Sequence, residues 1–304
     1  MREPIQSHPD ARRGAIAAAS CYLLWGLVPV YWRRLAAIDP VELIAHRHVW
    51  SLVVLSALVA WQGGLVAIRA TLRSPRGVAM HLLSGSLLTV NWLVYVYGVN
   101  TGHVTECSLG YFLVPLVNVL VGRFVLHERM HRLQWLAVAF AALGVALLVA
   151  ALGELPWIAL ALAGSWGAYS LMRKRSTLPA LPALSLETML LSPLALGWLV
   201  LCAWRGDGAL GRVDGVTHAL LLSAGVITAI PLLLFAYGAQ RIRLSTLGLL
   251  QYVSPSVQLL LGVLVYDEPF PAARAISFAC IWVGLCLYTF DGLWLQRRRA
   301  AAMR

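Results

Sequence analysis

The sequence predicts an all-α integral membrane protein in which ten transmembrane helices form two inverted five-helix repeats around a central cavity. Three observations lead to this fold class. The 304-residue chain is 60% hydrophobic and only 12% charged, whereas a soluble protein carries roughly 25% charged residues. Its apolar residues gather in stretches long enough to span a bilayer. One of these stretches recurs 140 positions later in the chain.

Each predicted element is an apolar stretch of about 20 residues, the length at which a helix crosses the hydrocarbon core of a bilayer. Short loops separate the stretches, and no loop is long enough to form a separate soluble domain. An even number of spans places both termini on the same side of the membrane. The ten predicted spans cover residues 14–35, 40–61, 78–99, 104–126, 133–152, 155–172, 185–204, 216–238, 245–266 and 273–292.

The basic residues predict which side holds the termini. Clusters at residues 69–76, 173–175 and 297–299 fall on the side of the N-terminus when the spans are followed in order, and few basic residues fall on the other side. An excess of Lys and Arg marks cytoplasmic loops, so we expect both termini in the cytoplasm. The net charge of +11 is then a topology signal, and no nucleic-acid partner is expected.

An internal repeat divides the chain into two halves. The stretch YFLVPLVNVLVGRFVLHE at residues 111–128 recurs as QYVSPSVQLLLGVLVYDE at residues 251–268. Each half holds five spans, and because five is odd, the second half must be inverted relative to the first. Inverted repeats are a common construction of secondary transporters, whose substrate site lies between the repeats. We expect the two units to cover residues 1–152 and 153–304.

In each copy, a proline, an amide and a glycine lie on one face of the predicted helix because of their spacing. A proline inside a helix leaves the carbonyl four residues earlier without its partner, and in lipid that carbonyl must face protein or water. The two stripes are therefore expected to line a cavity, with close packing of the two helices as the alternative. The stripes are Tyr111, Pro115, Asn118 and Gly122 in the first copy, and Gln251, Pro255, Gln258 and Gly262 in the second.

Polar and aromatic residues on other spans supply further candidates for the site. Asn91 needs a partner for its amide, and Glu187 lies near the predicted start of its span, where capping of the helix N-terminus is the alternative role. Aromatic stripes in membrane helices also serve packing. The candidates for substrate binding are Arg47, His46, Tyr22, Trp25, Asn91, Tyr95, Tyr111, Asn118, Glu187, Gln251, Tyr252 and Gln258, and the helix-breaking positions of the cavity are Pro115, Gly122, Pro255 and Gly262.

Arg47 lies about two helical turns inside the second predicted span, too deep for an ordinary loop charge. A charged side chain near the bilayer centre costs about 2.5–3.5 kcal/mol on insertion scales and usually faces a cavity or a partner. One interpretation is that Arg47 pairs with Glu106 at the outer start of the fourth span. The other, which we favour, is that Arg47 faces the central cavity. There its planar guanidinium would bind an anionic or carbonyl-bearing group of the substrate.

The motifs of other functional classes are missing from the sequence. It contains no nucleotide-binding loop, no paired catalytic carboxylates and no zinc motif, and its five cysteines lack metal-ligand spacing. We expect neither an enzyme nor a cofactor or metal site. The favoured function is secondary transport of a small molecule across a lipid bilayer. The alternative is a membrane-embedded sensor or enzyme with no net transport, and the oligomeric state, a monomer included, is left open.

The energy source of transport can be bounded from the same evidence. Without a nucleotide site, transport must draw on an ion gradient, on exchange or on the gradient of the substrate itself. Protons are favoured over sodium as the coupling ion, because the sequence shows no cluster of oxygen ligands for a sodium ion. The titratable candidates are His46, Glu106 and Glu187.

Four segments carry a resemblance to a known family: HRHVWS at 46–51, LTVNWLVYVYGVN at 88–100, SLGYFLVPLVN at 108–118 and RLSTLGLLQYVSP at 243–255. They resemble RarD-type proteins, the chloramphenicol-sensitivity proteins of the drug/metabolite transporter superfamily, which are built from two EamA-type five-helix repeats. The resemblance extends over nearly the whole chain. It implies a multi-pass transporter of small metabolites or drugs in the cytoplasmic (inner) membrane, with a central cavity and alternating access.

The chain departs from the family pattern near the ends of the two repeated stretches. Relatives tend to have glycine before the closing glutamates Glu128 and Glu268, where this chain has His127 and Asp267. A functional role of these glutamates therefore does not transfer. We interpret both as structural residues, placed where a negative charge suits a helix N-terminus.

Overall fold

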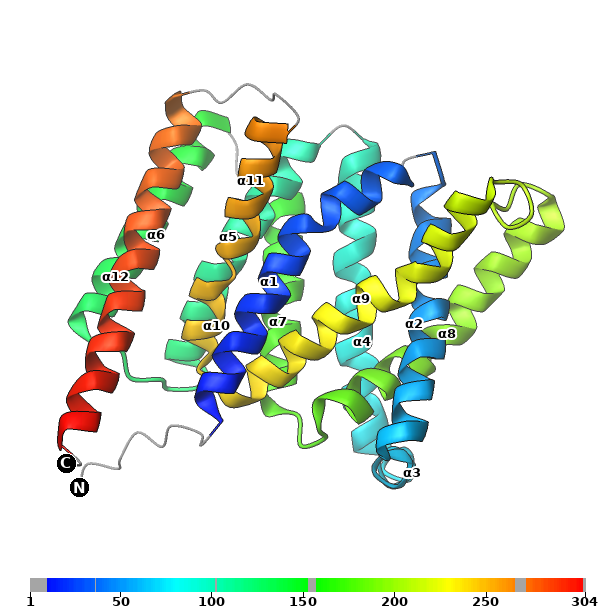
Figure 1. The fold of residues 1–304 in the computed structure, drawn as a ribbon, viewed down its shortest axis with the longest axis horizontal. Coiled ribbons are helices and arrows are strands. Elements are labelled where there is room, and N and C mark those ends of the chain that lie inside the picture. Colours follow the sequence, from blue (N-terminus) through cyan, green and yellow to red (C-terminus); the bar gives the residue numbers. More distant parts are fainter. Residues whose placement is uncertain (1–9, 36, 102, 153–156, 266–271, 303–304) are drawn as a thin grey trace.

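The computed structural model describes residues 10–35, 37–101, 103–152, 157–265 and 272–302, and every regular element within these ranges is an α-helix. Figure 1 shows a bundle in which the start of α1 and the end of α12 lie at the same end. In chain order the helices are α1 (Ala11–Arg34), α2 (Pro40–Gln62), α3 (Leu65–Leu72), α4 (Pro75–Asn100), α5 (Val104–Phe124), α6 (Arg132–Leu152), α7 (Trp157–Arg175), α8 (Ala180–Arg205), α9 (Gly215–Arg241), α10 (Leu244–Leu250), α11 (Val253–Val265) and α12 (Ala272–Ala302).

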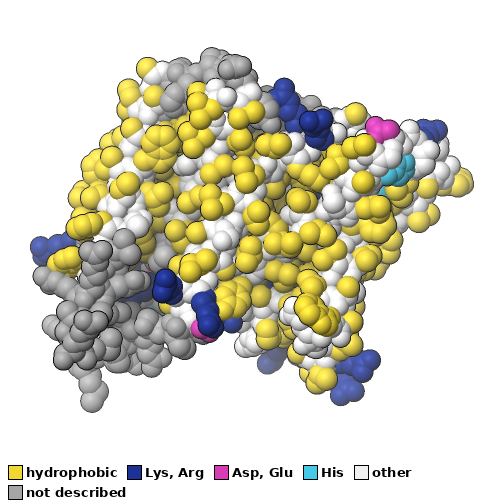
Figure 2. Space-filling view, in the orientation of Figure 1, with side chains coloured by type: hydrophobic (Ala, Val, Ile, Leu, Met, Phe, Trp, Pro, Cys, Tyr) yellow, Lys and Arg dark blue, Asp and Glu magenta, His cyan; other side chains and the backbone are white. Residues whose placement is uncertain are grey.

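The helices have the length and composition of a multi-pass membrane protein. Within the described residues, six segments are long and apolar enough to cross a bilayer, and three shorter apolar helices accompany them. Figure 2 shows apolar side chains over the middle of one face, with Lys and Arg toward its two ends. This distribution suits a protein whose central part contacts the hydrocarbon core of a bilayer. The six segments are Ala11–Arg34, Pro40–Gln62, Pro75–Gly98, Ala180–Arg205, Gly215–Arg241 and Leu244–Val265.

Two details of the helices differ from the sequence prediction. The predicted span 245–266 is not one helix, because the chain turns at Gln251 and Tyr252 between α10 and α11. Pro255 is consequently the third residue of α11, within the first turn, where backbone N–H groups have no helical acceptor in any case. The loop predicted around residues 65–77 also contains the short helix α3, which the hydropathy pattern did not reveal.

Contacts between the two halves of the chain are reciprocal. A Cβ added to Gly144 of α6 would lie 2.6 Å from the carbonyl oxygen of Ser277 on α12, and one added to Gly284 of α12 would lie 2.6 Å from that of Ala137 on α6. Ser277 and Gly284 follow Ala137 and Gly144 by 140 positions each. The same contact therefore occurs twice with the halves exchanged, which is the pattern of a twofold relation.

Other helix contacts also occur twice with the two halves of the chain exchanged. Gly26 of α1 packs against Val257 of α11, and Gly167 of α7 packs against Val117 of α5. In the same way α4 packs against α7, while α9 packs against α1. At these glycines, the absence of a side chain lets two helices approach closely, as is common between helices in membranes.

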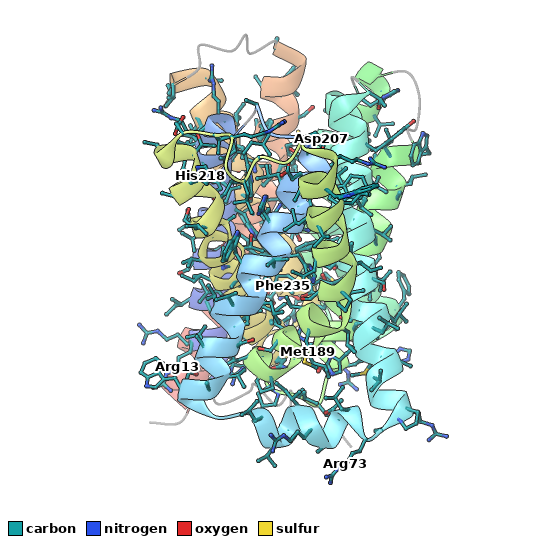
Figure 3. The ribbon with its side chains drawn as sticks, turned by 90° about the vertical axis from the view of Figure 1, so that its right-hand side faces the viewer. Arg13, Arg73, Met189, Asp207, His218 and Phe235 are labelled. Carbon is teal, nitrogen blue, oxygen red and sulfur yellow. The ribbon has the colours of Figure 1, made fainter. Side chains whose placement is uncertain are left out.

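An aromatic cluster fills the centre of the bundle. Trp25 packs edge-on against Trp166, with 5.1 Å between ring centroids, and Phe235 lies 5.2 Å from Trp166. Tyr22 and Tyr169 complete the cluster, so that α1, α7 and α9 all contribute. Figure 3 shows Phe235 midway between the two ends of the bundle. Such rings bury large apolar areas and favour tilted and edge-on pairs.

The two ends of the bundle differ in the residues that they present. Figure 3 shows Arg13 and Arg73 at one end and Asp207 and His218 at the other. We call the first the basic end and the second the Asp207 end. Arg13 and Arg73 thus share a side, in agreement with the sequence-based topology. Which side of the membrane that is stays a prediction.

Candidate functional site

A cavity of about 50 Å³ lies between α2, α4, α8 and α9. Leucine, isoleucine and alanine side chains form much of its wall, and a few polar side chains interrupt them. This combination of an apolar wall with sparse polar groups is typical of small-molecule sites. The lining residues are Ile44, Arg47, His48, Ser51, Leu55, Gly85, Leu88, Thr89, Trp92, Leu184, Glu187, Thr188, Leu191, Thr228, Ala229 and Leu232.

Local signals at the starts of α2 and α9 fix where these two walls begin. Asp39 caps α2 by accepting from the backbone N–H groups of Val41 (2.9 Å) and Glu42 (3.0 Å), and Pro40 is the first helical residue. Asp214 caps α9 in the same way, and the bond from the Thr217 N–H (2.7 Å) lowers the pKa of its carboxyl. From its start at Pro40, α2 carries Arg47 about 10 Å into the bundle.

The guanidinium of Arg47 is held between aromatic rings. Its Cζ lies 3.1 Å from the ring centroid of Trp92 on α4 and 4.5 Å from that of Trp32 on α1. Its Nε donates to Oγ1 of Thr228 on α9 at 3.1 Å. The hydroxyls of Tyr31 and of two further tyrosines lie within electrostatic range. Cation–π contacts of this kind stabilise a desolvated guanidinium and fix its plane.

Arg47 has no acidic partner in the described part of the chain, where no carboxylate lies within ion-pair distance of its nitrogens. Its one hydrogen bond uses Nε, so the terminal N–H groups remain available for a ligand. The side chain of Glu106, the alternative partner considered from the sequence, lies outside the described residues, and that pairing stays a prediction.

A buried cluster of charged groups adjoins the cavity. Oε1 of Glu187 on α8 accepts from Nη1 of Arg173 on α7 at 3.1 Å and lies 3.3 Å from Nδ1 of His81 on α4. Each of the three side chains is at most 3% exposed. The alternative role of Glu187 as a helix cap is wrong, because α8 begins at Ala180 and Glu187 lies two turns inside it.

The two repeated stripes lie at helix–helix contacts and not among the residues that line the cavity. Asn118 of α5 donates its amide to Oε1 of Gln251 at 3.3 Å, and the hydroxyl of Tyr252 donates to the carbonyl of Phe112 at 3.3 Å. Gln258 donates to the carbonyl of Trp25 at 3.2 Å. These contacts match the packing alternative for the stripes, while a role in binding stays a prediction.

Pro115, Gly122 and Pro255 are buried, and Gly122 lies against the carboxylate of Glu128. Gly262 lies within α11.

The remaining candidates occupy several environments. Asn91 donates to the carbonyl of Leu162 and to the hydroxyl of Ser165, both at 2.9 Å, and so joins α4 to α7. Tyr95 and Tyr111 pack against each other at 5.6 Å and lie within electrostatic range of Arg47.

Among the substrate-binding candidates, Arg47 and Glu187 are the ones that line the cavity, and the other candidates lie off its wall. Tyr22 and Trp25 belong to the central aromatic cluster. His46 faces Glu42 at 3.5 Å and is not among the lining residues.

Sequence reasoning missed several residues of the site. His48, Trp92 and Thr228 line the cavity, yet none was singled out. Arg173 was counted among the cytoplasmic charges, although it is fully buried. In the sequence, the one signal for such a buried partner was Glu187, because a carboxylate inside an apolar span requires a partner.

Glu128 is structural, but it does not cap the helix that follows it. Its Oε1 accepts from the N–H of Leu244 at 2.7 Å, and its Oε2 accepts from the N–H and the hydroxyl of Ser245 at 3.1 and 2.6 Å. It therefore ties the end of α5 to the start of α10, in the other half of the chain. Glu268 lies outside the described residues.

Comparison with known proteins adds a family likeness to this geometry. The chain matches the EamA-like transporter family twice, over residues 12–150 and 155–290. It is 42% identical to an uncharacterized transporter, YojE, of Bacillus subtilis, over 93% of this chain and 96% of that protein. It is 41% identical to the protein RarD of Streptomyces exfoliatus, over 98% and 95% of the two chains.

The likeness extends to a solved crystal structure. It superimposes with a TM-score of 0.72 at 22% identity, covering 93% of this chain and 99% of the other. At that identity the match shows the fold alone.

Proposed function

The chain belongs to the EamA-like transporter family and is a multi-pass membrane transporter, and from this premise we propose that it moves small metabolites or drugs across the cytoplasmic membrane by alternating access. The substrate class that the site favours is a largely apolar molecule bearing a carboxylate or carbonyl group. The proposed site is the cavity between α2, α4, α8 and α9, with Arg47 as the group that binds the oxygen atoms.

The proposed architecture has ten spans in two inverted repeats, residues 1–152 and 153–304, related by a pseudo-twofold axis in the membrane plane. The reciprocal glycine contacts of α6 and α12 support a twofold relation. An odd number of spans per repeat then requires the axis to lie in the plane. α3 would lie at the membrane surface, and α10 with α11 would form one broken span.

The proposed orientation places both termini in the cytoplasm. The basic end of the bundle holds Arg13 and Arg73, and the end of α7 at residues 173–175 is also basic. This distribution favours the basic end as the cytoplasmic one. Arg47 then lies nearer the outer side of the cavity, because α2 begins at Pro40 near the Asp207 end.

The observation that carries the proposal is the cation on the cavity wall. Arg47 is held by Trp92, Trp32 and Thr228 without an acidic partner among the described residues. Burying an unpaired charge in an apolar wall is costly, so a permanent site of this kind is best explained by a ligand that supplies the missing acceptor. Guanidinium binds carboxylates with two parallel hydrogen bonds.

The apolar wall indicates the rest of the substrate. Leu55, Leu88, Leu184, Leu191 and Leu232 surround the space beside Arg47. An aliphatic or aromatic body would bury its surface against them. A strongly hydrophilic body would lose its hydration without a compensating contact.

Counterflow in proteoliposomes tests the proposal. The purified protein is assayed with a panel of apolar carboxylates, their amides and chloramphenicol, the drug for which RarD-type proteins are named. We expect exchange of at least one carbonyl-bearing compound. Arg47→Lys should reduce this exchange by about tenfold or more, because an ammonium cannot form the bidentate contact.

A matched control is available in Arg241, whose guanidinium stacks at 3.5 Å on Tyr237 but lies outside the cavity lining. Arg241→Lys should retain exchange. Full exchange by Arg47→Lys with correct insertion and unchanged thermal stability would contradict the assignment of Arg47.

A further inference from the structure

We propose that His81, Glu187 and Arg173 form the proton-binding site that couples a pH gradient to substrate movement. This inference rests on the transport function proposed above and assigns its energy source to a particular cluster. Glu187 is the central member, since it lines the cavity on one side and meets Arg173 and His81 on the other.

The cluster is incompletely satisfied in this conformation. Among the described residues, no hydrogen-bond partner is found for the buried Oε2 of Glu187, Nε2 of His81, or Nε and Nη2 of Arg173. Buried polar groups are nearly always paired. An ion pair held through one carboxylate oxygen offsets little of the free-energy cost of removing two charges from water. Oε2 of Glu187 is therefore an acceptor at which a proton can be added without breaking an existing bond.

The position of the cluster suits a coupling role. A proton that enters from the cavity reaches Glu187 directly. Arg173 belongs to the last turn of α7, beside the exposed residues at the basic end of the bundle. The cluster thus lies between the cavity and the end that the basic residues assign to the cytoplasm, where α4, α7 and α8 meet.

Charge balance gives the consequence of proton binding. In the ion pair of Arg173 with Glu187, the positive and negative charges balance. A proton on Oε2 of Glu187 removes the carboxylate charge and leaves Arg173 buried without its counter-ion. A buried unpaired cation is strongly unfavourable, so α7 and α8 would separate and Arg173 would move toward water. The cavity would then open at the basic end.

Other titratable groups around the cluster are few. From α2, His48 contacts the carbonyl of Thr188 through Nε2 at 2.9 Å. From α7, Tyr169 lies within electrostatic range of both Glu187 and Arg173. The contacts of the described residues add no charged side chain from α3, α5 or α9.

A second carboxylate–histidine pair offers a natural control. Glu42 lies 3.5 Å from His46 on α2 and is about as buried as Glu187. Its carboxylate accepts from the backbone N–H of Ala209 at 2.6 Å, pairs with no arginine of the described residues and does not line the cavity. If burial beside a histidine were sufficient for the proposed proton binding, Glu42 and Glu187 would both have this role.

Infrared difference spectroscopy of the purified, reconstituted protein tests proton binding without any substrate. We expect a carboxylic-acid band to appear as the pH falls, to vanish in Glu187→Gln and to persist in Glu42→Gln. His81→Gln should change the pH at which the band appears, because the imidazole lies 3.3 Å from the carboxylate. Persistence of the band in Glu187→Gln, its loss in Glu42→Gln, or the absence of any such band in the folded protein would overturn the proposal.

Accessibility of a reporter cysteine tests the coupling. Ser84 on α4 is buried one helical turn from His81, and its hydroxyl has no hydrogen-bond partner within the described ranges. In Ser84→Cys, labelling by a membrane-impermeant thiol reagent from the basic end should rise about tenfold when Glu187→Gln, which mimics the protonated acid, is added. Adding Glu42→Gln should leave labelling unchanged.

Native Cys21 is fully buried and reports global unfolding in the same sample by its own labelling. Equal labelling of Ser84→Cys in all backgrounds, or labelling that rises together with that of Cys21, would overturn the coupling role. Neither measurement requires a transported compound, so failure of the proposed transport function and failure of this inference would be told apart.

Discussion

The two copies of the repeated proline motif adopt different backbones. α5 runs without interruption through Pro115, whereas the matching segment turns at Gln251 and Tyr252 before Pro255. In α5, the proline withdraws a donor from the middle of a helix. In the second copy, the carbonyl of Gln251 accepts from the N–H of Ser254 at 3.1 Å instead. The matching prolines thus lie in the middle of one helix and in the first turn of another.

As a result, the side-chain amides of the two copies have different hydrogen-bond partners. Asn118 donates to Gln251, whereas its counterpart Gln258 donates to the carbonyl of Trp25. The reciprocal pair of Tyr111 with Gln258 is not formed among the described contacts. The α6–α12 contact, by contrast, is the same from either side. The repeat therefore determines which helices meet, while a local break decides which polar groups meet.

The largest expected effect concerns the close approach of α10 to α5. A Cβ on Gly248 would lie 2.7 Å from the carbonyl oxygen of Pro115 and 2.8 Å from Cβ of Asn118. Gly248→Leu should therefore reduce the free energy of unfolding by about 1–3 kcal/mol or more, measured by thermal unfolding in detergent. Gly164→Leu is the control, because nothing lies within 4 Å of its Cβ position. Equal melting temperatures for the two variants would contradict the α5–α10 contact.

A smaller effect separates the two amides. Asn118→Leu removes the donor of a buried bond and leaves the buried Gln251 without a partner, which should cost about 1–3 kcal/mol. Gln258→Leu changes an exposed side chain, and should stay within about 0.5 kcal/mol. Thermal unfolding of both variants, with the Asn118 and Gln251 double-mutant cycle, measures the difference. Equal losses of stability in the two variants, or a larger loss in Gln258→Leu, would contradict this difference between the amides.

Much of the fold could be predicted from the sequence because its determinants are local. Apolar stretches of bilayer length mark the helices, and each predicted span overlies one helix except 245–266. The position of the break could not be predicted from the prolines. Both copies of the repeat carry one at the matching position, yet Pro115 lies inside a continuous helix while Pro255 follows a break.

The candidate site was only partly predictable. The depth of Arg47 followed from counting residues along α2, and the cavity does include it. Its aromatic neighbours Trp32 and Trp92 come from α1 and α4, and no local pattern identifies such partners. Successive helical residues point about 100° apart, which is why His48 reaches the cavity lining while His46 faces Glu42.

The most direct test of the account is an experimental structure of the reconstituted protein with a transported carboxylate bound. The account predicts the carboxylate oxygens within hydrogen-bond distance of the terminal nitrogens of Arg47, and the apolar body between α2, α4, α8 and α9. It also predicts that Trp92 and Thr228 keep their contacts with the guanidinium. A ligand bound away from this cavity, or Arg47 occupied by Glu106 while the ligand binds elsewhere, would contradict it.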